Sequence, residues 1–138
     1  MRPKQRVIIV GAGDLGKSMA EKLSHLNNEV TLIDQDEQKL SSVSTNFGGN
    51  VVLGDAASSE VLKEINLGEC DLFISATECD KTNLYLALLA KKYYRIPKIY
   101  IRLYDKNKSK VLEGESITIV CPAELSVKQL EETLLREV

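Results

Sequence analysis

The chain has 138 residues, of which 43% are hydrophobic and 28% charged, and this is the size and composition of one ordinary globular domain. Its formal net charge of -2, with lysines and arginines spread along the sequence, excludes the basic patch that nucleic-acid binding requires. Three cysteines are an odd number without close spacing, so we expect reduced thiols, a cytoplasmic location and no metal site. No apolar segment is long enough for a signal peptide or a bilayer span, so any link to a membrane is expected to run through a partner.

Apolar runs rich in β-branched residues recur along the chain and predict six strands. Between them lie segments in which apolar residues have helical spacing, for example Met19 with Leu23 and Leu84 with Leu88. Strands that are apolar on both faces and joined by helices form parallel sheets, and right-handed crossovers favour a doubly wound order. The sequence therefore predicts an α/β fold, a Rossmann-type doubly wound sheet of about six parallel strands with helices on both faces. The predicted strands are residues 7–10, 30–33, 51–53, 72–74, 99–103 and 117–120.

The last part of the chain carries two further predicted elements. Residues 104–116 are polar and rich in lysine, which indicates a short or irregular helix. Pro122 ends the last strand, and residues 123–137 carry leucines at roughly helical spacing, which predicts a C-terminal amphipathic helix. No linker, repeat or low-complexity tract interrupts the sequence, so residues 1–138 are predicted to form a single domain.

A glycine-rich loop follows the first predicted strand and runs directly into a helix. Gly11 permits the tight turn, Gly13 lets backbone amides approach a pyrophosphate, and Gly16 lets the helix pack closely on the strand. The free N–H groups of the first helical turn, aided by the helix dipole, attract phosphates. The loop is therefore a predicted phosphate site, and its residues are Gly11, Ala12, Gly13, Asp14, Leu15 and Gly16.

A carboxylate completes this dinucleotide-binding pattern. Asp34 ends the second predicted strand eighteen positions after Gly16, where it can accept hydrogen bonds from ribose hydroxyls. The alternative is that the glycines only make a tight turn and that Asp34 caps the next helix. A 2′-phosphate beside Asp34 would be repelled, and no lysine or arginine follows before Lys39, so NADP is disfavoured.

Several further segments occur in a fixed order, and together with the loop they carry a resemblance. Gly54-Asp55-Ala56 follows the third predicted strand, Ser75-Ala76-Thr77 with Asp80 and Asn83 follows the fourth, and Ile101-Arg102-Leu103 lies within the fifth. In this order the chain resembles the N-terminal lobe of RCK domains, also called the TrkA N-terminal domain, from regulators of potassium transport. One departure is Ala123, which is inserted between Pro122 and Glu124 of the family's Pro-Glu pair.

The resemblance implies a fold, a ligand and partners. It implies an adenine nucleotide, NAD(H) or ATP, ADP or AMP, and a homodimer that can assemble into a ring beneath a membrane potassium transporter or channel. Many members carry a second, C-terminal RCK lobe, which these 138 residues do not include; either the sequence is a trimmed piece of a longer chain or the protein is a stand-alone subunit. The cofactor-binding residues implied beyond the glycine loop and Asp34 are Asp55, Ala56, Thr77, Glu78 and Arg102.

Two of these residues have alternative roles. Arg102 can bind a phosphate through a charge-assisted hydrogen bond, or it can lie on the surface paired with Asp105 or Glu113. Asp55 can contact the adenosine, or it can cap the helix that begins near Ser58. The sequence leaves both alternatives open.

Catalysis is not expected. Tyr94 and Lys98 have the spacing of a short-chain dehydrogenase pair, but Pro97 should end any helix between them. His25, the only histidine, is expected on the surface, and Cys79 is a conceivable redox thiol at a helix N-terminus. Because no second region is available to hold a substrate, the alternative function is the cofactor-binding half of an NAD-dependent oxidoreductase completed by a companion chain.

Overall fold

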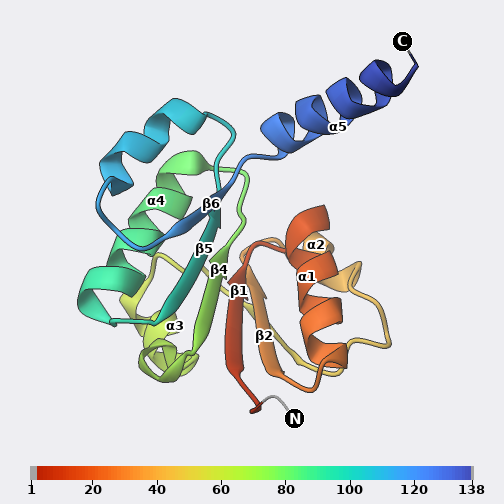
Figure 1. Cartoon of the computed structure of the whole chain (residues 1–138). Coiled ribbons are helices and arrows are strands. Elements are labelled where there is room, and N and C mark those ends of the chain that lie inside the picture. The colour runs from red at the N-terminus through yellow and green to blue at the C-terminus, as the bar shows by residue number, and fades with distance from the viewer. Residues whose placement is uncertain (1–2, 138) are drawn as a thin grey trace.

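The computed structural model describes residues 3–137 and contains a six-stranded sheet in which every neighbouring pair is parallel (Figure 1). The spatial order is β3-β2-β1-β4-β5-β6. The chain therefore starts in the middle of the sheet, adds β2 and β3 on one side of β1, and then adds β4 to β6 on the other side. This is the doubly wound order that the sequence predicts. The strands are β1 Arg6–Val10, β2 Glu29–Asp34, β3 Asn50–Leu53, β4 Leu72–Ser75, β5 Lys98–Arg102 and β6 Thr118–Val120.

Helices cover both faces of the sheet. The helix α1 and the short α2 pack on one face, and α3 and α4 pack on the other. The helical elements are α1 Asp14–His25, α2 Glu37–Ser41, α3 Ser59–Glu64, η1 Leu67–Glu69, α4 Asp80–Leu88, η2 Leu89–Tyr93, η3 Lys106–Leu112 and α5 Pro122–Arg136.

The core lies on both sides of the sheet because successive strand residues point to opposite faces. In β1, Val7 and Ile9 join the apolar cluster beneath α1 and α2, whereas Ile8 and Val10 join the cluster beneath α3 and α4. All four side chains are almost fully buried. Central strands that are apolar on both faces are typical of parallel sheets, and this confirms the basis of the fold prediction.

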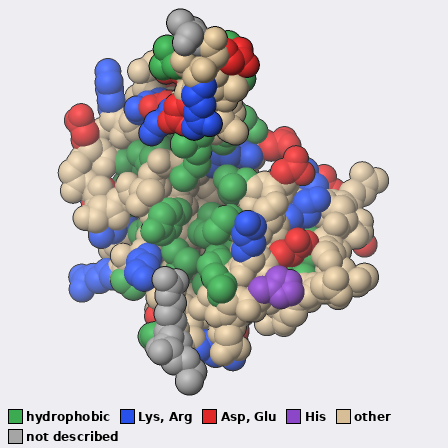
Figure 2. All heavy atoms as spheres, turned by 45° about the vertical axis from the view of Figure 1, so that its right-hand side comes forward, with side chains coloured by type: hydrophobic (Ala, Val, Ile, Leu, Met, Phe, Trp, Pro, Cys, Tyr) green, Lys and Arg blue, Asp and Glu red, His purple; other side chains and the backbone are tan. Residues whose placement is uncertain are grey.

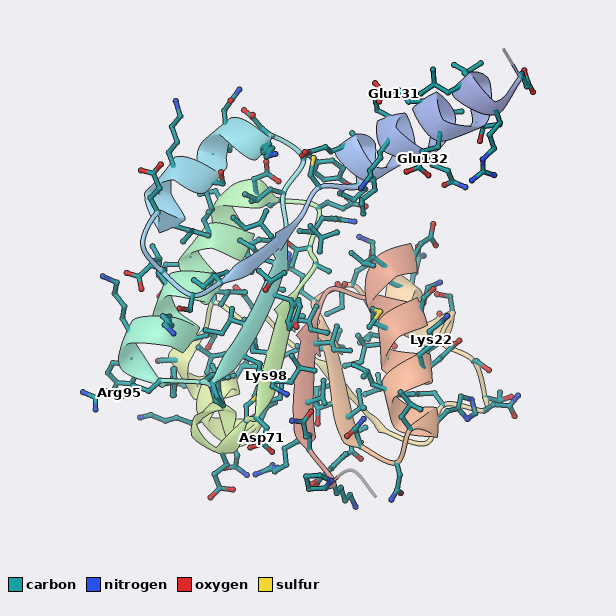
Figure 3. The ribbon with its side chains drawn as sticks, viewed as in Figure 1. Lys22, Asp71, Arg95, Lys98, Glu131 and Glu132 are labelled. Carbon is teal, nitrogen blue, oxygen red and sulfur yellow. The ribbon has the colours of Figure 1, made fainter. Side chains whose placement is uncertain are left out.

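The elements near the end of the chain agree with the sequence in kind. The polar segment 104–116 contains η3, a short 3₁₀ helix. Tyr94 and Lys98 do not share a helix, because η2 ends at Tyr93 and Lys98 begins β5. Figure 3 shows Asp71 and Lys98 at the edge of the sheet where β4 and β5 begin, opposite the edge to which the glycine loop is attached.

The helix α5 stands apart from the rest of the chain. It projects away from the sheet after β6 (Figure 1), and none of its residues is buried. Its leucines remain exposed, with 62% of Leu130 and 60% of Leu134 accessible to solvent. Figure 3 shows Glu131 and Glu132 of α5 clear of the sheet. The predicted amphipathic helix is therefore present, and no residue of its apolar stripe is buried against residues 3–137. Within these residues no helix has the length and apolar character to cross a bilayer.

Candidate functional site

A cavity of about 350 Å³ opens at the carboxyl ends of the central strands, between β1 and β4, where the strand order reverses. In open α/β sheets this switch point is where ligands bind. The cavity combines the end of β1 and the glycine loop with the ends of β2 and β3 and the β4–α4 connection. Its lining residues are Val10, Gly11, Gly13, Asp14, Asp34, Gln35, Lys39, Gly54, Asp55, Ala56, Ala57, Ala76, Thr77, Glu78, Cys79, Thr82, Arg102 and Tyr104.

The three glycines of the loop meet very different surroundings. Gly11 has φ +105°, and a Cβ there would lie 2.6 Å from the carbonyl oxygen of Ala76. A Cβ on Gly16 would lie 1.7 Å from the carbonyl oxygen of Gly11, so the fold itself requires both glycines. At Gly13, by contrast, no protein atom lies within 4 Å of the place that a Cβ would take, and the residue lines the cavity. Gly13 thus lines the cavity at the start of α1 and has open space at its Cβ position.

Asp34 braces the glycine loop. Its Oδ2 accepts the N–H of Ala12 at 2.8 Å, and its Oδ1 accepts the N–H of Asp36 at 2.8 Å. The N-cap of α2 is Asp36, whose carboxylate accepts the N–H of Gln38, so Asp34 does not cap that helix. Each carboxylate oxygen has further lone pairs, and Asp34 is half-buried in the cavity wall, so it can still accept hydrogen bonds from a ligand.

Asp55 and Ala56 form the wall that follows β3. The Asp55 carboxylate accepts the N–H of Ala57 at 2.9 Å and closes a tight turn. The N-cap of α3 is Ser58, so Asp55 stabilises the turn before the helix rather than capping it. Asp55 is exposed in the cavity, and Ala56 is buried beside it.

A buried asparagine organises the opposite wall, and the sequence did not single it out as a site residue. The Asn83 side chain is fully buried, and its Oδ1 accepts hydrogen bonds from the hydroxyls of Ser75 and Thr77 and from the Thr77 N–H. Its Nδ2 donates to the carbonyls of Thr77 and Arg102. One amide therefore ties the end of β4 to the end of β5 and fixes Thr77 at the cavity.

Arg102 lies across this wall. Its Nη2 donates to the carbonyl of Thr77, and its guanidinium carbon lies 4.7 Å from the ring centroid of Tyr104, in a cation–π contact. It forms no ion pair with Asp105 or Glu113 within the described residues, so the surface-pair alternative is not what the structure contains. Its Nε is buried and has no hydrogen-bond partner among residues 3–137.

Asp80 holds the segment after β5 against the start of α4. Its carboxylate accepts the N–H groups of Tyr104 at 2.8 Å and Asp105 at 3.0 Å, and Lys108 lies 3.7 Å away. Burial raises the pKa of Asp80, but these backbone donors and the lysine outweigh burial and hold the pKa below its usual value. The ionised carboxylate thereby keeps Tyr104 at the rim of the cavity.

The cavity brings together most of the predicted binding residues. Gly11, Gly13, Asp14, Asp34, Asp55, Ala56, Thr77, Glu78 and Arg102 line it, whereas Ala12, Leu15 and Gly16 are not part of its lining. Lys39 and Tyr104 also line the cavity, and neither was predicted as a site residue. Lys39 forms an ion pair with Glu78, with 3.3 Å between Nζ and Oε1, across the cavity mouth. The position of Lys39 five residues after Asp34 was the only signal in the sequence.

This arrangement defines a class of protein: a Rossmann-type domain with a glycine loop and a carboxylate at the switch point, which is the geometry of nucleotide-binding folds. Residues 7–122 match the model of the TrkA-N domain family, and the chain belongs to this family. It is 39% identical over 92 residues to a Trk system potassium uptake protein TrkA from Vibrio alginolyticus, a match that covers 66% of this chain. The chain spans only 20% of the length of that relative.

Solved structures share the fold. The GsuK channel bound to NAD superposes with a TM-score of 0.83 at 24% identity, over 99% of this chain and 24% of the channel chain. The Kef C-terminal domain from Shewanella denitrificans, in its AMP-bound form, superposes with a TM-score of 0.70 at 24% identity, over 94% of this chain and 81% of that chain. At this identity the likeness establishes the fold.

Proposed function

We propose that the chain is a nucleotide-sensing lobe that regulates potassium transport and that it binds an adenine nucleotide in the switch-point cavity without altering it chemically. The candidate ligands are NAD(H) and ATP, ADP or AMP. Support comes from the family, whose curated members include potassium uptake proteins, and from two structural neighbours whose ligands are NAD and AMP.

One observation carries the proposal. The fold requires a glycine at positions 11 and 16, but no protein contact requires one at Gly13. The space that a side chain would fill is open, and Gly13 lines the cavity beside the free amides of the first turn of α1. A diphosphate placed there would accept hydrogen bonds from these amides, and the helix dipole would favour its charge. No contact within the described residues explains a glycine at position 13, whereas a diphosphate bound beside it would.

The remaining walls fit the other parts of such a ligand. Asp34 would accept the ribose hydroxyls, and Asp55 would lie near the adenosine. A 2′-phosphate would face the carboxylate of Asp34, while the nearest cation that lines the cavity after β2, Lys39, is engaged with Glu78. NADP is therefore disfavoured as the ligand.

The test is to identify the nucleotide that copurifies with the chain and then to titrate NAD⁺, NADH, ATP, ADP and AMP by calorimetry into nucleotide-free protein. We expect at least one to bind at a single site and Gly13→Val to abolish that binding. The control is Gly68→Val, because Gly68 lies in η1 and does not line the cavity. Gly114 is not used, because at its φ of +83° any side chain would strain the backbone. Equal occupancy in the Gly13 variant would contradict the proposed site.

The signal must leave the cavity, and the segment after β5 offers a route. Tyr104 lines the cavity, and its carbonyl oxygen lies 3.8 Å from the Cys121 thiol at the N-cap of α5. Lys106 of η3 forms an ion pair with Glu124 of α5, with 2.7 Å between the charged atoms. We infer that a ligand which moves Tyr104 or Arg102 changes the orientation of α5, since a ligand shifts an equilibrium only through contacts that differ between two states.

We also propose that α5 mediates a homodimer on the cytoplasmic side of the membrane. A helix of this length extends about 22 Å, and its exposed leucines need an apolar partner. Figure 2 shows apolar side chains gathered over the face below α5. On the side of the sheet that carries α1, Tyr100 is 38% exposed and Leu15 and Met19 are only partly buried. The second copy's α5 would cover this face.

Light scattering tests the dimer. The chain is expected to be dimeric at micromolar concentration, and Leu130→Glu with Leu134→Glu is expected to make it monomeric. The matched control is Glu131→Gln with Glu132→Gln on the same helix, which should stay dimeric. A monomeric wild-type chain would overturn this part of the proposal.

A further inference from the structure

The cavity that would hold the nucleotide is lined by more acidic than basic groups. Four carboxylates and two cations line it, which leaves an excess of two negative charges: Asp14, Asp34, Asp55 and Glu78 against Lys39 and Arg102. A site for a phosphate-bearing ligand is expected to carry the opposite balance. This excess of negative charge should weaken the binding of nucleotides in proportion to the negative charge that they bring into the cavity.

Both cations of the lining already make contacts within the described residues. Lys39 is neutralised by Glu78 at 3.3 Å. The guanidinium of Arg102 donates to the Thr77 carbonyl and lies over the Tyr104 ring at 4.7 Å. Either group would have to give up these contacts before it could bind a terminal phosphate, so no cation of the lining is preorganised for one.

Asp14 stands where the phosphates would lie. It is the first residue of α1, it is exposed, and it lines the cavity next to the open space at Gly13. Its carboxylate forms no ion pair or hydrogen bond within residues 3–137. A negative charge in the first turn uses the same favourable helix potential that attracts a phosphate, and it repels each further negative charge brought beside it.

Nucleotides differ in how much charge they bring to this position. Each phosphate in the pyrophosphate of a dinucleotide is esterified and carries one negative charge. A terminal phosphate, as in ADP or ATP, carries about 1.5 to 2 negative charges at pH 7. Oxidised NAD also carries a positive charge on its nicotinamide ring, so it brings the least net negative charge of these ligands.

We propose that Asp14 is a specificity-determining residue, which makes the cavity select a dinucleotide with a fully esterified pyrophosphate over ADP and ATP. This inference rests on the proposed nucleotide site and narrows its ligand class. The selection acts by repulsion: the amides of α1 bind any diphosphate, and the Asp14 carboxylate weakens the binding of those that end in a free phosphate.

Calorimetric titration of NAD⁺, ADP and ATP into the nucleotide-free chain at low salt, with magnesium removed by EDTA, tests the proposal. The wild-type chain is expected to bind NAD⁺ more tightly than ADP or ATP. Asp14→Asn keeps the shape and removes the charge, and it should tighten ADP and ATP binding at least about fivefold, which is the effect of about one unit-charge contact in water. NAD⁺ affinity should also rise, but by a smaller factor than the ADP and ATP affinities, because its pyrophosphate brings fewer negative charges beside Asp14.

Two controls separate charge at the cavity from charge elsewhere. Asp14→Glu retains the carboxylate and should retain the wild-type preference. Glu60→Gln removes an acidic group from the first turn of α3, away from the cavity lining, and should leave all three affinities unchanged. Raising the salt concentration should narrow the gap between NAD⁺ and ATP in the wild type but much less in Asp14→Asn.

The failures of the two proposals are distinguishable. If the wild type binds nucleotides but Asp14→Asn changes the three affinities equally or not at all, the selection is not set by Asp14 and the inference is overturned while the proposed function stands. Tighter binding of ATP than of NAD⁺ by the wild type also overturns it. If none of the three binds to the wild type or to either Asp14 variant, the proposed function fails and the inference fails with it.

Discussion

Replacing Asn83 by alanine is expected to destabilise the domain strongly, because the Asn83 amide is the fully buried centre of the wall between β4 and β5. The side chain makes five hydrogen bonds, to Ser75, Thr77 and the Arg102 carbonyl. Alanine leaves several of these groups without a partner, and each unsatisfied buried group costs about 1–3 kcal/mol. Partial access of water to the Thr77 end lowers the total, so we expect the free energy of unfolding to fall by about 3 kcal/mol.

Urea unfolding followed by circular dichroism measures this loss. The matched control is Asn46→Ala, because Asn46 is exposed and its side chain forms no hydrogen bond within the described residues, so its effect should stay within about 0.5 kcal/mol. A loss below about 1 kcal/mol for Asn83→Ala would refute the reasoning, since it would mean that the wall does not depend on this amide. In the folded fraction, the variant should also bind nucleotide more weakly than the wild type, because Thr77 and Arg102 are no longer fixed.

Three further outcomes are expected. Gly13→Val should cost no more than about 1 kcal/mol of stability, as a poorer N-cap residue, whereas Gly16→Ala should cost more than about 3 kcal/mol in the same urea titration, because its Cβ would strike the loop backbone. The folded state holds the pKa of Asp80 below its usual value of 3.8, so the free energy of unfolding should fall as the pH drops below about 3.8. Asp80→Asn should lower the free energy of unfolding near neutral pH and weaken its dependence on pH in this acid range. Iodoacetamide should alkylate Cys79 before Cys70. The Thr82 hydroxyl and nearby backbone N–H groups lower the pKa of Cys79, whereas burial raises the pKa of Cys70 to about 11. Peptide mass spectrometry measures the two rates, and equal rates would contradict this order.

The sequence predicted those features that local pattern determines. The six apolar runs became the six strands within one residue at each end. The central strands β1 and β4 are buried on both faces, whereas β3, β5 and β6 keep exposed residues and were found from their β-branched, apolar composition. The glycine loop lies between β1 and α1 as expected, and Asp34 reaches the cavity because it ends the neighbouring strand. Parallel strands bring their carboxyl ends to one edge, so residues that follow β1 to β5 could be expected to meet there.

Other parts of the site depend on contacts that no spacing rule specifies. Asn83 lies inside α4 and outside the glycine motif, and only the packing of α4 on β4 and β5 places its amide between two strand ends. The ion pair of Lys39 with Glu78 joins elements that are far apart in the sequence. Asp34 also does more than the motif suggests, because it braces the Ala12 amide before any ligand is considered. Such roles follow from tertiary geometry.

The direction of α5 is a further property that the sequence left open. Its leucine spacing predicts an amphipathic helix but does not say which surface the apolar stripe covers. In the structure the stripe stays largely exposed, and this is the physical reason to look for a second copy.

A crystal structure of the chain grown with saturating NAD⁺ tests the central claim most directly. The claim predicts the pyrophosphate against the backbone amides at the start of α1, above Gly13, and the adenosine ribose on the carboxylate of Asp34. A cavity without ligand under these conditions, or NAD⁺ bound at another surface, would contradict it.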